Sequence, residues 1–183
     1  MVGPGRYERA REPVGEGGGP AAPEAPGQAL ILLGVVLDAT PATVIEYRAE
    51  VPEPAAFVRL FSTTGWDPQG HLTVESAAEA LAPTWYAVSA YAGDRLVGIG
   101  RIIGDGVLHA LLVDVIVDPA YRHAGVGSVI VERLVAECRR HRIVDVQLFC
   151  AYGVRPFYER LGFAARPDDA PGMELVAGDR QPV

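Results

Sequence analysis

The chain has 183 residues, ordinarily the length of one domain and enough to bury a hydrophobic core. Hydrophobic residues make up 49% and charged residues 21%, so a wholly disordered chain is excluded. All 16 basic residues are arginines, and the formal net charge is −7. The negative charge argues against a general nucleic-acid binder, which usually carries a basic surface.

The first 42 residues differ from the rest of the chain. Residues 1–28 are rich in glycine and proline and hold almost no large apolar side chain, which predicts a flexible tail. Residues 29–37 form an apolar run that is too short for a membrane span of about 20 residues. This run is an extra strand, a dimer contact or translated sequence upstream of the true start. Since no convincing signal-peptide pattern is present, we expect a cytoplasmic protein without a membrane partner, and a homodimer is left open.

A single folded domain is predicted over residues 43–178, with 179–183 as a C-terminal tail. Its first half combines short strands with two helices, because alternating apolar residues indicate strands, and Pro54 and Thr73 suit helix starts. The predicted elements are, in order, a strand at 44–49, a helix at 54–62, a loop at 63–68, a helix at 74–81, and a hairpin of strands 85–91 and 96–103.

A strand, a glycine-rich turn and a long helix follow, and the rest of the chain is organised around them. The strand at 107–117 leads into a turn with Gly125 and Gly127, where the absence of side chains lets a phosphate approach the backbone closely. A helix that begins at such a turn presents unpaired N–H groups to an anion. Its apolar residues keep the spacing of one buried face, at Val126, Val129, Ile130, Leu134, Val135 and Cys138.

The C-terminal part predicts a strand at 144–150 that runs parallel to the strand at 107–117, because the long helix makes a right-handed crossover between them. Pro156 opens a short helix that ends at Gly162. Phe163 and residues 173–175 are expected to complete the sheet. The predicted fold class is α/β, with a mixed, mostly antiparallel sheet flanked by helices.

Two motifs in this region resemble signatures of the GNAT superfamily of N-acetyltransferases. The pattern V-D-P-x-x-R-x-x-G-x-G at residues 117–127 is similar to the acetyl-CoA signature of that superfamily. The run FYERLGF at 157–163 is similar to its second hallmark and follows at the usual distance. The order of elements over residues 43–175 also fits, so the resemblance covers most of the chain beyond the tail. It is closest in kind to the small single-domain bacterial type.

The resemblance implies acetyl-CoA as co-substrate and no metal. The pyrophosphate is expected on the N–H groups of residues 123–128. The pantetheine arm is expected along residues 115–117, where family members splay their central parallel strands. Arg122 either contacts phosphate or braces the loop. The residues implied to bind the co-substrate are Val115, Ile116, Val117, Arg122, His123, Ala124, Gly125, Val126, Gly127 and Ser128.

Two residues are candidates for the chemistry. The resemblance places Tyr158 beside the sulfur, where a phenol can protonate the departing thiolate. Because Phe157 is its neighbour, only one of the two can face the core squarely, and the hydroxyl favours Tyr158 facing the cleft; its alternative role is aromatic packing. Asp114 is the candidate base, since it interrupts an apolar strand and similar members carry an acidic residue there. Its alternative is a carboxylate bonded to a neighbouring loop.

Other side chains are weaker candidates. Trp66 lies in the loop where family members shape the acceptor pocket, or it caps the core. His109 and His123 are further acid–base candidates, and Cys150 ends a strand beside the expected site. Many members carry a glutamate in the strand at 144–150 and an asparagine just after it, and this chain has neither.

Together these observations predict an acetyl-CoA-dependent N-acetyltransferase. It is expected to move an acetyl group to a primary amine of a small molecule or peptide by direct attack in a ternary complex. A non-catalytic acyl-CoA-binding sensor or interaction module is the alternative. Both need the glycine turn, whereas only the enzyme needs Tyr158.

Overall fold

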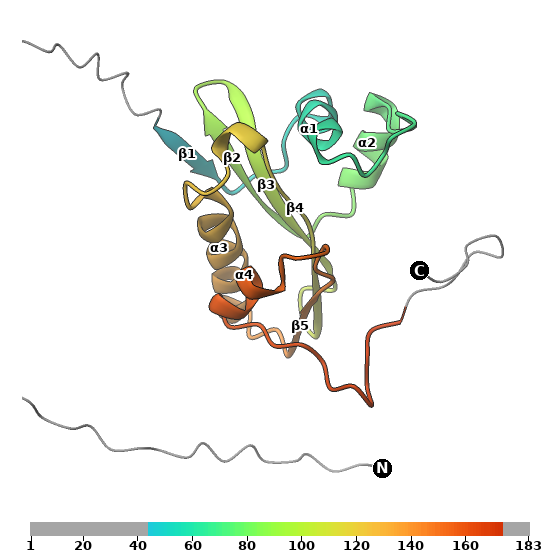
Figure 1. Ribbon diagram of the computed structural model, residues 1–183, viewed down its shortest axis with the longest axis vertical. Helices are drawn as coiled ribbons and strands as arrows, with labels where there is room; N and C mark the ends of the chain where they lie inside the picture. The colour runs from blue at the N-terminus through green and yellow to red at the C-terminus, as the bar shows by residue number, and fades with distance from the viewer. Residues whose placement is uncertain (1–43, 174–183) are drawn as a thin grey trace, which may run out of the picture. The chain divides into compact units, whose positions relative to one another are not determined.

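The computed structural model describes residues 44–173, so the predictions for residues 1–43 and 174–183 lie outside the described residues. A five-stranded sheet carries helices on both faces (Figure 1). The strands are β1 (Ile45–Arg48), β2 (Tyr86–Ala92), β3 (Arg95–Gly104), β4 (His109–Val117) and β5 (Asp145–Leu148). The helices are α1 (Pro54–Phe61), α2 (Val74–Leu81), α3 (Val126–Arg140) and α4 (Arg155–Arg160), with short 3₁₀ turns η1 (Ser62–Thr64) and η2 (Pro119–Tyr121).

The strands lie side by side in chain order, β1-β2-β3-β4-β5. Every neighbouring pair is antiparallel except β4 and β5, which are parallel and joined by α3 as the crossover. The predicted mixed, mostly antiparallel sheet with flanking helices is therefore confirmed. Among the described helices, none is both long and apolar enough to cross a bilayer.

The prediction that the chain returns to the sheet after α4 is wrong for the described part of this segment. Phe163 lies in no strand, and Met173 is 88% exposed, while residues 174–175 lie outside the described range. Pro167 cannot donate a ladder hydrogen bond, and its carbonyl instead accepts the N–H of Ala170 in a turn. Within the described residues, the parallel pair β4–β5 is thus at the edge of the sheet.

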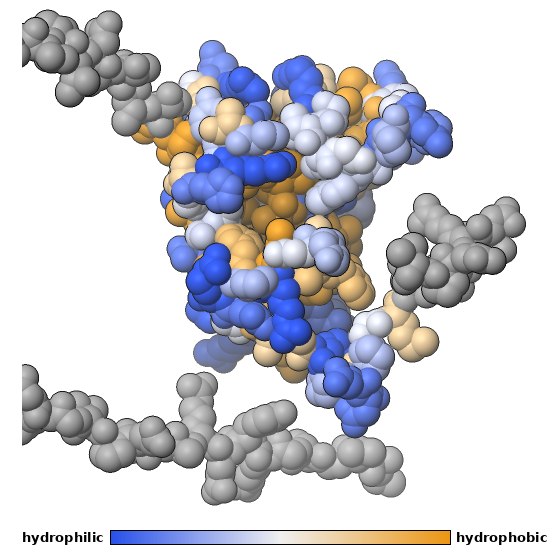
Figure 2. All heavy atoms as spheres, in the orientation of Figure 1, coloured by the Kyte–Doolittle hydropathy of each residue, from blue (hydrophilic) through white to orange (hydrophobic). Residues whose placement is uncertain are grey.

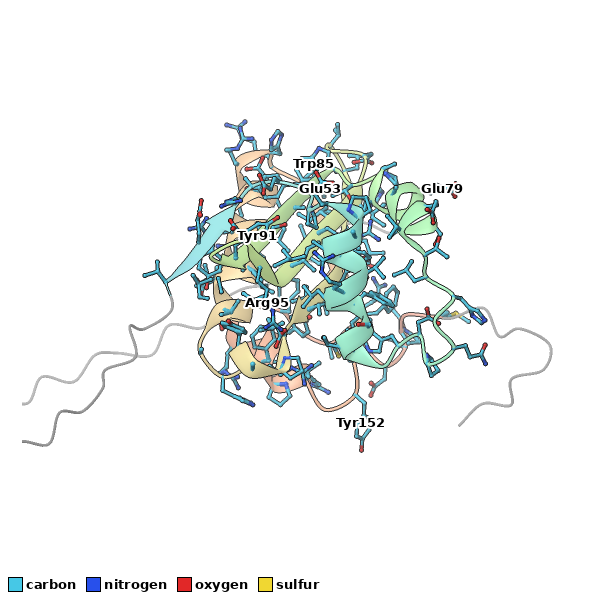
Figure 3. All side chains as sticks on the ribbon, turned by 90° about the horizontal axis from the view of Figure 1, so that it is seen from above. Glu53, Glu79, Trp85, Tyr91, Arg95 and Tyr152 are labelled. Carbon is cyan, nitrogen blue, oxygen red and sulfur yellow. The ribbon has the colours of Figure 1, made fainter. Side chains whose placement is uncertain are left out.

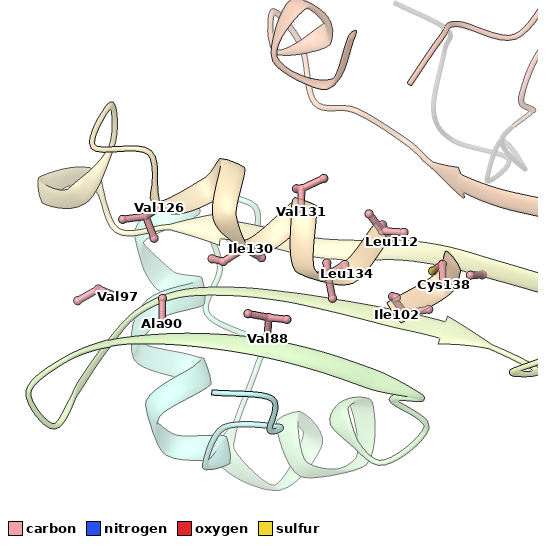
Figure 4. Close-up of a cluster of buried hydrophobic side chains, with 11 residues drawn as sticks. Val88, Ala90, Val97, Ile102, Leu112, Val126, Ile130, Val131, Leu134 and Cys138 are labelled. Carbon is pink, nitrogen blue, oxygen red and sulfur yellow. The ribbon is translucent and has the colours of Figure 1, made fainter. Parts of the chain in front are cut away.

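Two hydrophobic clusters attach the helices to the two faces. The larger one lies between α3 and strands β2 to β4 (Figure 4) and includes the fully buried Ile130 and Leu134. Cys138 belongs to it with 1% exposure, which confirms its prediction as a small core residue. The second cluster lies under α1 and α2 on the opposite face, with Phe57 and Leu81 at its centre. Each face of the sheet therefore has its own core.

Two glycines in β3 let α3 approach the sheet closely. A Cβ on Gly98 would lie 2.9 Å from Cδ1 of Ile130, and a Cβ on Gly100 would lie 2.6 Å from Cγ2 of the same residue. Real Cβ atoms do not approach other atoms so closely, so a larger residue at either position would force the α3 side chains that pack there to shift. The position of α3 matters because its first turn begins at the glycine loop.

Candidate active site

β4 has two halves with different neighbours. From His109 to Leu112 it pairs with β3 on one side and β5 on the other, and the pairing with β5 ends where Leu112 meets Leu148. Residues 113–117 pair with β3 around a bulge and have no partner in β5. On the side of the molecule shown in Figure 2, apolar surface gathers at the centre. Polar surface lies on either side of it, over α4 and over α1 and α2. The second half of β4 thus has an open side.

The direction of the backbone groups in this half follows from one hydrogen bond. Asp118 donates its N–H to the carbonyl of Val97 in β3, at 2.8 Å. Because peptide groups alternate in direction along a strand, Val117 points its N–H and C=O away from β3, toward the open side. The same alternation applies to Val115, which lies just beyond the bulge. The N–H of Val117 and the N–H and C=O of Val115 are available to hydrogen-bond an extended arm laid beside β4, whereas the carbonyl of Val117 already accepts a hydrogen bond from Nε of Arg122.

The glycine turn presents a row of unpaired donors at the end of the same strand. Among the described residues, no acceptor receives a hydrogen bond from the N–H groups of residues 123–128. His123 and Gly125 have positive φ angles of 62° and 80°, a conformation that turns successive N–H groups toward one side. The groups lie at the N-terminus of the 15-residue α3, where the helix dipole is positive. A Cβ on Gly125 would meet no atom within 4 Å, so open space lies in front of the turn.

The residues of this turn differ in what they contact. Arg122 donates from Nε to the carbonyl of Val117 at 3.1 Å, which is the bracing role of the two that were expected. Val126 is 2% exposed and belongs to the core, so it can offer only its backbone. A Cβ on Gly127 would lie 3.5 Å from both Val117 and Phe157, so this glycine faces the protein interior. Gly125 therefore faces open space at its Cα, whereas Gly127 faces Val117 and Phe157 there, and the N–H groups of both remain without an acceptor among the described residues.

An unexpected ion pair fastens the start of the turn. Asp118 is 5% exposed, and its carboxylate accepts the N–H of Ala120 at 2.9 Å and Nη2 of Arg95 at 2.6 Å. The Asp-Pro sequence signals the cap of η2, but nothing in the local sequence points to Arg95, which is the first residue of β3. A cavity of about 530 Å³ adjoins this pair on the α1 side, with Arg59 also in its wall.

Tyr158 lies between two other aromatic rings. Its ring contacts Phe157 edge-on at 4.9 Å and Phe163 at 6.0 Å, and both Phe157 and Tyr158 are half-buried against the larger core. The two rings share the contact with the larger core, and neither is fully buried in it. Burial raises the pKa of the Tyr158 hydroxyl above its usual value of 10, and the nearby Cys150 raises it further when ionised. The phenol stays protonated at neutral pH and can act as a donor.

Asp114 lies at the bulge of β4 with a positive φ of 51°. Its Oδ2 accepts a hydrogen bond from Nε of Arg101, a buried arginine of β3 that is 7% exposed. The carboxylate is thus bonded to a side chain of the neighbouring strand β3, whereas the alternative role expected for it was a bond to a neighbouring loop. Arg101 was missed, although it interrupts an apolar strand in the same way as Asp114. The other oxygen, Oδ1, has no hydrogen-bond partner among the described residues and is accessible to solvent.

The remaining candidates lie at different distances from this centre. Trp66 is 52% exposed and packs its ring edge-on against Phe61 at 5.8 Å, so it covers the edge of the smaller core and also offers a free face. Cys150 is exposed, close enough to influence Tyr158. His109 lies at the other end of β4, about 16 Å along the strand from the bulge, which excludes it from the chemistry. The described residues hold no group of three or more side chains suited to a metal ion.

An open strand half beside a helix N-terminus with six N–H groups that are unpaired among the described residues suits an acyltransferase domain, because such a site can hold a phosphate at the helix and an extended chain beside the strand. Residues 46–163 match the family model described as the acetyltransferase (GNAT) family. The chain belongs to this family.

Similar proteins agree with this assignment. The chain is 32% identical over 127 residues to serotonin N-acetyltransferase 2, chloroplastic, of Oryza sativa, covering 69% of this chain and 64% of that protein. It is 36% identical over 86 residues to GCN5-related N-acetyltransferase 1, chloroplastic, of Arabidopsis thaliana, covering 47% and 44%. The chain thus spans less than two thirds of these relatives. A solved GNAT family acetyltransferase of Streptococcus pneumoniae superposes with a TM-score of 0.64 at 25% identity, over 74% of this chain and all of that one.

Both named relatives come from plants, and both names include the word chloroplastic. They do not confirm the expected resemblance to the small bacterial type in particular.

Proposed function

We propose that this protein is an acetyl-CoA-dependent N-acetyltransferase that acetylates a primary amine by direct attack in a ternary complex. The observation that carries the proposal is the continuity of two features: six unpaired N–H groups at the start of α3 and an unpaired strand half directly before them. The first suits a pyrophosphate and the second suits a pantetheine arm with its amide groups. We also propose that it is of the small single-domain bacterial type of this family.

The chain offers groups for each part of the binding. The N–H groups of residues 123–128 would hold the pyrophosphate, and the N–H of Val117 together with the open-side groups of Val115 would hydrogen-bond the arm. Arg122 keeps the turn attached to the end of β4. Ile116 points into the smaller core, so it contributes rigidity. When bound, acetyl-CoA supplies a thioester whose carbonyl carbon can accept an amine nitrogen.

The two catalytic candidates lie on opposite faces of the sheet. Tyr158 packs with the larger core beside α3, whereas Asp114 and its partner Arg101 lie on the face of α2, because Arg101 also donates to the carbonyl of Ala80. The half of β4 without a β5 partner lies between these faces. We therefore assign the α1–α2 face to the amine, where Asp114 Oδ1 would take up a proton of the attacking nitrogen. Tyr158 on the other face would donate its proton to the leaving thiolate.

The class of acceptor follows from the chemistry of the side chains on the α1–α2 face. A primary amine of a small molecule or of a peptide suits the half-buried carboxylate of Asp114, and Trp66 offers an aromatic face on the same side of the sheet. Two similar proteins are named for their acceptors: the serotonin N-acetyltransferase of Oryza sativa for a small-molecule amine, and a histone acetyltransferase of Glycine max for a protein. We propose a cytoplasmic protein without nucleic-acid or membrane partners, and homodimer formation is left open.

The test is release of coenzyme A thiol from acetyl-CoA with a panel of arylalkylamines, polyamines, amino acids and lysine-containing peptides. Release that depends on one acceptor class is the expected result, and the acetylated product is verified by mass spectrometry. Binding of acetyl-CoA without release for any acceptor would favour the non-catalytic acyl-CoA sensor. A chain that does not bind acetyl-CoA would overturn both functions.

A further inference from the structure

We propose that Arg101 is a positioning residue whose ion pair with Asp114 stabilises the bulge of β4. The bulge in turn decides which backbone N–H and C=O groups of residues 115–117 face the open side of the strand. This inference rests on the proposed function, because those residues are assigned there to the acyl arm. It concerns a side chain of β3 that need not touch either substrate.

The bulge exchanges the faces of β4. Before it, the even-numbered Ala110 and Leu112 are buried in the larger core, on the side of α3. After it, the odd-numbered Val115 and Val117 pack against that core, and Ile116 is buried in the smaller one. The register shows the cause: between Ile99 and Arg101, β3 advances two residues while β4 advances three. The extra residue is at Asp114.

The same exchange decides which peptide groups reach the open side. Without the extra residue, the strand after the bulge would shift by one position, and every side chain and peptide group would turn to the opposite direction. Ile116 would then present its N–H and C=O to the opening in place of Val115 and Val117. The bulge is therefore a condition for the arrangement in which the carbonyl of Val117 meets Arg122.

The bulge needs a compensating interaction. Asp114 has a left-handed backbone conformation that is unfavourable for residues other than glycine, although aspartate tolerates it better than most. Arg101 provides three hydrogen bonds around it. Its Nε donates to Asp114, and its Nη1 donates to the carbonyl of Ala80 at 2.8 Å and to the hydroxyl of Thr84 at 3.3 Å. One buried arginine thus ties the bulge to the end of α2 and to the residues just after it.

The ion pair also orients the carboxylate. Arg101 binds one oxygen of Asp114 and leaves the other without a partner among the described residues. A carboxylate held by one oxygen has a fixed direction, so Oδ1 is presented to one place. Loss of Arg101 would free the carboxylate to rotate as well as relax the strand, so both acyl-arm binding and amine handling depend on this side chain.

The test compares Arg101→Gln and Arg101→Lys with the control Arg140→Gln, which removes an exposed arginine whose ion pair with Glu137 lies at the far end of α3. Backbone amide hydrogen exchange of the free protein is measured first. We expect faster exchange in peptides covering residues 113–117 for Arg101→Gln, a smaller increase for Arg101→Lys, and none for Arg140→Gln. Lysine keeps a donor for Asp114 but lacks the fork that also reaches Ala80, so it should rescue in part.

The second measurement is the affinity for acetyl-CoA, together with kcat and KM for the acceptor. We expect Arg101→Gln to weaken acetyl-CoA binding about tenfold, which corresponds to about one lost hydrogen bond, and to lower kcat as well. Should Arg101→Gln fail to fold, Arg101→Lys carries the test with a smaller effect in the same direction.

Unchanged exchange at residues 113–117 would overturn the inference whatever the activity. Faster exchange with unchanged acetyl-CoA affinity and kcat would also overturn it, since the bulge would then have only a structural role. If the wild-type chain binds no acetyl-CoA, the proposed function fails, and the exchange measurement still decides whether Arg101 holds the bulge.

Discussion

The two halves of β4 are both rich in apolar residues and differ in what surrounds them. The first half, His109 to Leu112, is paired on both sides, and its residues Ala110 and Leu112 are buried in the larger core. The second half, residues 113–117, is paired on one side and contains a charged residue with a left-handed backbone. An apolar strand therefore stabilises the fold where its backbone is fully paired. It becomes available for a ligand where one neighbour ends.

The largest effect is expected at Tyr158, the proposed proton donor in α4. Tyr158→Phe removes the proton donor while keeping the ring, so turnover should fall by about 10²-fold or more while acetyl-CoA affinity stays the same. Thiol release and calorimetric binding measure the two quantities. Tyr152→Phe is the matched control, because Tyr152 is fully exposed on the same connection (Figure 3). Normal turnover in Tyr158→Phe would remove this residue from the chemistry.

A smaller effect separates the two glycines of the turn. Gly125 has a φ of 80° and Gly127 does not have a positive φ, so an alanine is strained at the first position alone. Gly125→Ala should distort the row of N–H groups at a cost of about 1–2 kcal/mol, which weakens acetyl-CoA binding by about tenfold.

Gly127→Ala is the control for that experiment. Its Cβ would make ordinary contacts at 3.5 Å, so affinity should change less than about threefold. Isothermal calorimetry on both variants gives the comparison. Equal losses in the two variants would show that the turn binds through something other than the conformation of Gly125.

The pH dependence tests the surroundings of Tyr158. Its pKa is raised by burial and then by Cys150, so the hydroxyl stays protonated below pH 10 and the loss of turnover on the alkaline side should begin above that value. Cys150→Ser removes the thiolate that adds to the shift, so the alkaline limb should move slightly to lower pH. The ratio of variant to wild-type kcat with one acceptor cancels the titration of the amine. A limb that moves upward would contradict this account.

The smallest effect on activity is expected at the start of the paired half. Asp105 accepts the N–H groups of Val107, Leu108 and His109, which lowers its pKa to about 2. Because the folded-state pKa is lowered, the stabilisation is present above pH 3.8 and is lost as the pH falls through 2. Asp105→Ala should lower Tm by a few degrees at neutral pH, with kcat unchanged. The difference in Tm from wild type should shrink toward pH 2, and a loss of kcat would contradict the division of β4.

Sequence patterns located the glycine turn because its requirements are local. A strand, two glycines and an amphipathic helix follow one another within the chain, so the turn could be placed from their order. The assignment of a phosphate to its N–H groups came from the family resemblance and stays a prediction. The start of β4 was predicted two residues too early, since Asp105 holds Val107 and Leu108 in a turn. The continuation of the sheet at Phe163 failed for a comparable reason, because turn formation overrides an apolar pattern.

The sequence by itself determined the fold class, the position of the turn and the identity of Asp114 and Tyr158 as the polar residues in apolar surroundings. Tertiary structure alone decided which distant residues are in contact. Arg101 pairs with Asp114, Arg95 pairs with Asp118, and the pairing of β5 with β4 ends at Leu112. Local propensity acts over a few residues and can be read along the chain. Strand register, bulges and buried ion pairs join residues far apart in sequence, so they are set by how the whole sheet packs.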